Sequence, residues 1–240
     1  MCNIVFLCFY NECRKYYAEK MQYFLNEVAN IIGNGIFLFG ILFVMKIYYP
    51  VFKFLFLIQL WQWYVFSEVL KNAVSHLETE IRMNYFENIR SQRYSIWTIY
   101  FFRGIMYYIE STIIFFILVF LWCRISNVTV IYNGMVPISF FAYFITSLVL
   151  FLCIYYSVLC TVIKYKRASV FVSFMTTVML FMSGMVFETK WFVKLNIFYK
   201  MTTLLYHIDH HTIREIAEIL IVLIMTTLML LQYANYLMRK

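Results

Sequence analysis

Six long apolar stretches take up most of this 240-residue chain, and only short connections separate most of them. An α-helix rises about 1.5 Å per residue, so about 20 apolar residues cross the roughly 30 Å hydrocarbon layer of a bilayer. The pattern therefore predicts an all-α integral membrane protein with six transmembrane helices, in a single domain that covers residues 1–240. The spans are predicted at about 29–45, 50–70, 105–123, 136–160, 168–187 and 216–237.

The composition excludes an ordinary soluble domain. Hydrophobic residues make up 64% of the chain and charged residues 13%, against about 45–50% and about 25% in soluble proteins. The net charge is +8, but the lysines and arginines are scattered through the connections and are not interleaved with aromatic residues on one polar face. Their placement indicates membrane topology rather than a nucleic-acid partner.

The first segment and the basic residues predict the orientation. Residues 4–24 mix apolar and charged positions, which is typical of an interfacial helix. We expect it to form an elbow that leads into the first span. Basic residues favour the cytoplasmic side, and the run Lys164-Tyr165-Lys166-Arg167 lies in the short connection between the fourth and fifth spans. The sequence thus predicts a multi-pass protein of the cell membrane with both termini in the cytoplasm.

One polar interruption, residues 75–103, separates the second and third spans. Its charged residues alternate with apolar ones at near-helical spacing, and Met83, Phe86 and Ile89 would form an apolar ridge on a short helix. Such a helix can dock into a groove on another protein, or it can rest on lipid headgroups. The spacing alone leaves both interpretations open.

This interruption resembles the coupling segment of the permease subunits of type-2 ATP-binding-cassette (ABC) exporters. In that family, E-x-x-x-G-[TS]-[LF]-E-x-[LI]-x-x-[ST]-P follows the second of six spans, and an interfacial elbow helix precedes the first. Asn84 stands at the glycine position and tolerates a left-handed or turn conformation. The chain departs from the pattern at Tyr85 and at Gln92-Arg93. Four residues match in register: Glu80, Phe86, Glu87 and Ile89.

The resemblance implies a transport subunit rather than an enzyme. In the family two permeases, as a homodimer or a heterodimer, pair with a dimer of ABC ATPase subunits. The chain has no G-x-x-x-x-G-K-[ST] phosphate loop, so ATP would be bound by the partner, and no catalytic residue, cofactor or metal is expected here. Phe86 and Ile89 would fill an apolar groove on the ATPase, and Glu87 and Arg90 would fix orientation at its rim. The expected contact surface is Asn84, Tyr85, Phe86, Glu87, Ile89 and Arg90.

The resemblance also suggests a substrate. In its small size, without a large outer domain, the chain resembles permeases that export antimicrobial or signalling peptides or confer immunity to them. A peptide is therefore the expected substrate, while drugs, lipids and polysaccharides remain open.

Polar residues inside the spans form a candidate intramembrane site. Glu27, Asn30 and Asn34 share one helical face, and Glu110 lies deeper in the third span. A carboxylate in the bilayer costs on the order of 3 kcal/mol, so such residues face the protein interior or lie at the interface. We expect Glu110 to pair with Arg103 or with a tyrosine hydroxyl. Whether these residues face a translocation path is left open.

Two other functions are considered. His207, Asp209, His210 and His211 have ligand chemistry, but adjacent side chains point apart on a helix and no second ligand group is evident. An intramembrane metalloprotease would also need its carboxylates and histidines at one depth, whereas the predicted topology places them on opposite sides. The other alternative is a non-transporting membrane immunity or assembly protein.

Overall fold

The computed structural model describes residues 2–48, 52–86, 95–128, 130–131, 137–182 and 210–239. Within them the chain is helical apart from short turns and a two-residue parallel pair, β1 (Phe52–Lys53) with β2 (Val130–Ile131). The predicted all-α class is thus confirmed. The helices are α1 (Cys2–Gln22), α2 (Phe24–Tyr48), α3 (Phe54–Arg82), α5 (Ile96–Ser126), α6 (Pro137–Tyr165), α7 (Ser169–Met182) and α10 (His210–Arg239).

Four of the described helices are long and apolar enough to cross a membrane, which indicates a membrane protein. They are Phe24–Ile47, Ile96–Ser126, Tyr143–Tyr165 and Ile216–Tyr236. The other two predicted spans correspond to α3, which is long but more polar, and to α7, which the structure describes only to Met182.

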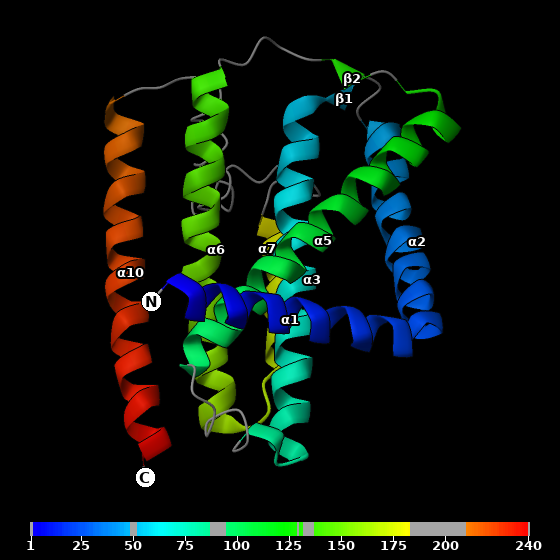
Figure 1. The fold of residues 1–240 in the computed structure, drawn as a ribbon. Helices are drawn as coiled ribbons and strands as arrows, with labels where there is room; N and C mark the ends of the chain where they lie inside the picture. Colours follow the sequence, from blue (N-terminus) through cyan, green and yellow to red (C-terminus); the bar gives the residue numbers. More distant parts are fainter. Residues whose placement is uncertain are drawn as a thin grey trace.

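Successive long helices run in alternating directions, with α3 in the middle (Figure 1). α3 packs against α5, α6 and α7, while α10 packs on α6. α1 lies across the bundle, nearly at right angles to α2, α3, α6 and α10 (Figure 1). The C-terminus lies at the end of the bundle where α3 and α6 also end (Figure 1).

The central position of α3 explains why its apolar signal is weak. Leu60, Val65 and Leu77 on α3 are fully buried, and so is the more polar Gln62. The Gln62 side chain donates to Ser147 Oγ (3.2 Å) and accepts from the Tyr143 hydroxyl (2.6 Å). Because protein surrounds this helix, its polar groups find partners that lipid does not offer.

The two helices that flank the polar interruption extend into it from both sides, beyond the ends of the predicted spans. α3 continues to Arg82 and α5 already begins at Ile96, so Glu78 and Glu80 lie buried in the last turns of α3 rather than in a separate exposed segment. Asn84, in the turn after α3, has a φ of 58°, the left-handed conformation that asparagine tolerates. The predicted short helix is described only through Phe86, because residues 87–94 lie outside the described residues.

Candidate functional site

A polar cavity of about 240 Å³ lies between α1, α2, α3 and α5. All four polar residues singled out from the sequence line it: Glu27, Asn30 and Asn34 from α2, and Glu110 from α5. The structure therefore brings the predicted set together in one place. Further polar residues in the lining are Lys20, Tyr64, Glu68, Lys71, Asn72 and Ser111.

The spacing of three polar residues along α2 directs their side chains to one side of the helix, which lines the cavity. Residues at i, i+3 and i+7 share one face of a helix, so Glu27, Asn30 and Asn34 point the same way. Ile32 and Ile36, on other faces of α2, are exposed. A side chain at position 35 would meet Leu118 on α5, since a Cβ there would lie 3.1 Å from its Cδ2. Glycine at this position lets α5 approach α2.

Lys20 is the cation that balances two carboxylates of the cavity. Its ammonium, at the end of α1, contacts Glu27 and lies 3.0 Å from Glu110 Oε1. The side chains of all three residues are largely shielded, with 23–30% exposed. Glu110 thus pairs with Lys20 and not with Arg103 or a tyrosine hydroxyl, which corrects the expected pairing. The reason is that α1 packs against α5, which brings Lys20 at the end of α1 to Glu110.

A second set of contacts closes the other side of the cavity. Asn34 Nδ2 donates to Glu68 Oε2 at 2.7 Å, and Lys71 Nζ lies 3.6 Å from Glu68 Oε1. Neither lysine nor Glu68 belongs to the site predicted from the sequence. Two lysines face three glutamates in this cavity, so one negative charge is in excess when all five groups are ionised. Carboxylate and amide oxygens here can accept hydrogen bonds from a cationic or amide-bearing group.

Arg103 joins α1, α3 and α5 by hydrogen bonds. Its guanidinium donates from Nε to Glu12 Oε2 and from Nη1 to Glu80 Oε1, both at 2.7 Å. Tyr100 donates its hydroxyl to the other oxygen of Glu80 at 2.6 Å. Only 8% of the Arg103 side chain is exposed. A guanidinium that satisfies two carboxylates in this way holds three helices at a fixed spacing.

A groove of about 650 Å³ between α1 and α3 connects the polar cavity with the end of α3. Lys20 and Glu27 line both the groove and the cavity, and Met83 and Tyr85 line the groove at the turn after α3. The groove therefore runs from one end of the predicted contact surface to the rim of the predicted polar site.

The predicted contact surface is described only in part. Asn84 and Tyr85 are exposed, and 60% of Tyr85 is accessible. Phe86 is half-buried against the core of this same chain. Glu87, Ile89 and Arg90 lie outside the described residues.

The side chains of the four residues with metal-ligand chemistry, His207, Asp209, His210 and His211, are not described. His207 and Asp209 lie outside the described residues, and the side chains of His210 and His211, at the start of α10, are not described either. Among the residues that the structure does describe, no group of three histidine, cysteine, aspartate or glutamate side chains could hold a metal ion.

Comparisons of the chain with protein-family models, with curated proteins and with solved structures each return no match.

Proposed function

We propose that this chain is the permease subunit of an ABC-type exporter, with six spans, an interfacial elbow helix in α1 and both termini in the cytoplasm. A separate ATPase subunit dimer hydrolyses ATP, and a second permease copy completes the transport path. Two features support the proposal. The long helices alternate in direction, and α1 lies across them (Figure 1).

The observation that carries the proposal is the groove between α1 and α3. It leads from the exposed turn at Met83 and Tyr85 to Lys20 and Glu27 at the rim of the polar cavity. A partner that binds the turn would therefore move the end of α3. Residues nearer the middle of this helix line the cavity.

The mechanism follows from the stiffness of α3. This helix runs without a break from Phe54 to Arg82, and Arg103 ties its last turns to α1 and α5. Closure of the ATPase dimer moves the end of α3, and the movement reaches α1 through this tie. Because the same tie holds α1 to α5, Lys20 stays beside Glu110 and leaves Glu27 on α2, and the cavity opens to a substrate group. The two states that such a transition needs are Lys20 bound to Glu27 and Lys20 released from it.

A peptide remains the proposed substrate. The cavity of about 240 Å³ is smaller than the roughly 300–1,000 Å³ of sites that enclose a drug-sized ligand. It can accept one polar group of a peptide, such as a terminal ammonium, against its excess negative charge. The rest of the peptide would pass between two permease copies.

The first experiment asks whether an ATP-hydrolysing subunit co-purifies with the chain and whether exposed Tyr85 holds it. We expect the wild-type chain to retain such a subunit in mild detergent and Tyr85→Ala to lower its recovery severalfold, because a buried aromatic anchor contributes about 2 kcal/mol or more at an interface. Tyr17→Ala is the matched control, since Tyr17 is 73% exposed on α1 and Tyr85 is 60% exposed.

The same preparations separate transport from its alternatives. ATP hydrolysis that responds to peptide in the wild-type complex, and not in the Tyr85→Ala or Glu87→Ala complex, supports the assignment. A chain that reaches the membrane but never retains an ATPase contradicts it. That outcome would favour a non-transporting immunity or assembly protein.

A further inference from the structure

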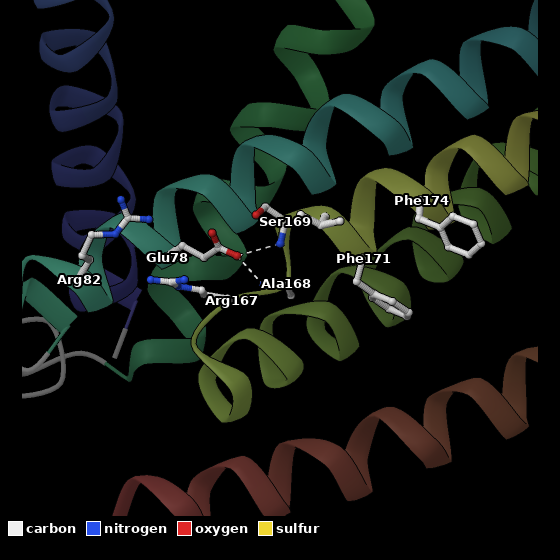
Figure 2. Close-up of a pocket in the computed structure, with 8 residues that line it drawn as sticks. Glu78, Arg82, Arg167, Ala168, Ser169, Phe171 and Phe174 are labelled. Carbon is white, nitrogen blue, oxygen red and sulfur yellow. Dashed lines mark hydrogen bonds between the residues drawn. The ribbon is translucent and has the colours of Figure 1, made fainter.

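A third hollow, a pocket of about 980 Å³, opens where α3 ends and α7 begins. Figure 2 shows Arg82 and Arg167 at one end of it and Phe171 and Phe174 at the other. None of these residues belongs to the polar cavity or the groove described above. The pocket thus has a cationic end and an apolar wall on one open surface.

Glu78 lies in this pocket but is already engaged. One of its carboxylate oxygens accepts hydrogen bonds from the backbone N–H groups of Ala168 (2.5 Å) and Ser169 (2.8 Å), as Figure 2 shows. It therefore caps the start of α7, where the first N–H groups have no partner within the helix. Glu78 is 8% exposed, and these two hydrogen bonds hold its carboxylate against the start of α7.

Arg82 and Arg167 are available to a ligand. Both are exposed, and neither forms an ion pair within the part of the chain that the structure describes. Lys164 in the last turn of α6 and Lys166 in the connection to α7 are also exposed. The planar guanidinium suits phosphate because it donates two parallel hydrogen bonds.

The apolar wall continues from the cationic end along α7. Phe171 is 56% exposed and Phe174 63% exposed, and they stand three residues apart on one side of an apolar helix. Three residues correspond to about 4.5 Å along the helix axis. An acyl chain lying along α7 would contact both rings while its headgroup stayed beside the arginines.

We infer that this pocket binds one anionic phospholipid. Its phosphate lies between Arg82 and Arg167, and an acyl chain lies on Phe171 and Phe174. Charge complementarity selects the anionic lipid, because a zwitterionic headgroup would bring an ammonium toward two guanidinium groups. Free phosphate would meet the arginines but would leave the aromatic wall uncovered. A bound lipid bridges the end of α3 and the start of α7, so it should stabilise the bundle.

Native mass spectrometry and thermal unfolding of the detergent-purified chain test this inference. The probes are phosphatidylglycerol, phosphatidylcholine with the same acyl chains, and inorganic phosphate. We expect phosphatidylglycerol to bind and to raise the unfolding temperature, and the two other probes to do so at least tenfold more weakly. Arg82→Gln/Arg167→Gln should weaken phosphatidylglycerol binding at least tenfold, and Phe171→Gln should weaken it severalfold.

Arg124→Gln serves as the matched control, because Arg124 is an exposed arginine at the far end of α5 with its guanidinium over the Phe120 ring. It should bind phosphatidylglycerol as the wild-type chain does. If the double variant unfolds without lipid, the single variants Arg167→Gln and Phe171→Gln carry the test. Undiminished phosphatidylglycerol binding by the variants, equal binding of phosphatidylcholine, or equal stabilisation by inorganic phosphate would overturn the inference.

Discussion

Lys20 shows how a single side chain makes buried acidic groups tolerable in this protein. Glu27 and Glu110 come from helices that are otherwise strongly apolar, and a carboxylate without a partner in the bilayer costs on the order of 3 kcal/mol. One ammonium contacts both carboxylates. The residue that matters most for the cavity is therefore outside the spans, at the end of α1.

We expect Lys20→Met to destabilise the protein by about 1–3 kcal/mol, because two partly buried carboxylates then face each other without a cation. Methionine keeps the length of the side chain and removes its charge. The measurement is thermal unfolding of the chain in detergent. Adding ethylammonium to Lys20→Ala should restore part of the lost stability, since the free ammonium can take the vacated position.

Lys71→Met is the control for that measurement. Lys71 is 45% exposed and lies 3.6 Å from one oxygen of Glu68, so its removal should change stability by less than about 1 kcal/mol. If Lys20→Met is no more harmful than Lys71→Met, Lys20 does not balance the cavity.

At the scale of the helices, the packing of α5 on α6 depends on a close approach at Gly104. Gly104 on α5 faces the ring of Tyr155 on α6, and a Cβ at position 104 would lie 3.0 Å from two of its ring atoms. Tyr155 is fully buried, and its hydroxyl donates to the Tyr100 carbonyl at 2.8 Å. The ring therefore cannot move aside without losing a buried hydrogen bond.

We predict that Gly104→Ala destabilises the fold by about 1–3 kcal/mol, the usual cost of overpacking a core. This cost exceeds the gain of up to about 1 kcal/mol that alanine brings to a helix. Gly40→Ala on α2 is the comparison, because nothing lies within 4 Å of its added Cβ. In detergent, the unfolding temperature of Gly40→Ala should equal or exceed that of the wild type. An equally stable Gly104→Ala would show that α5 and α6 do not approach as described.

At the scale of the whole molecule, two ends of the bundle can be distinguished. One end carries the C-terminus and the ends of α3 and α6 (Figure 1). The other carries the β1–β2 pair and the end of α5, where Lys46 Nζ donates to the Ser126 carbonyl at 2.9 Å. The basic connection between α6 and α7 lies at the first end, which is the cytoplasmic end in the proposed topology.

Cysteine labelling tests that orientation, in a background whose native cysteines are replaced by alanine. We expect a membrane-impermeant maleimide to label Arg124→Cys in intact cells. Lys164→Cys should react only after the membrane is permeabilised. Both original side chains are exposed, so access to the reagent, not burial, decides the result. The reverse pattern would invert the topology and rule out an ATPase at the end of α3.

The sequence by itself determined the helical class and the approximate place of the helices, although α3 continues to Arg82 and α5 begins at Ile96, both well beyond the predicted spans. It also placed Glu27, Asn30 and Asn34 on one face and allowed a left-handed Asn84. These features are local: they follow from hydropathy, from the 3.6-residue period of a helix and from the conformational range of one residue type.

Only the tertiary structure decided which charges meet. The pairing of Lys20 with Glu110, the contacts of Arg103 with Glu12 and Glu80, and the burial of a polar α3 each join segments far apart in the chain. Hydropathy could not reveal them, because it scores each residue against lipid or water. The neighbours of these residues are other helices, whose placement depends on how the whole bundle packs.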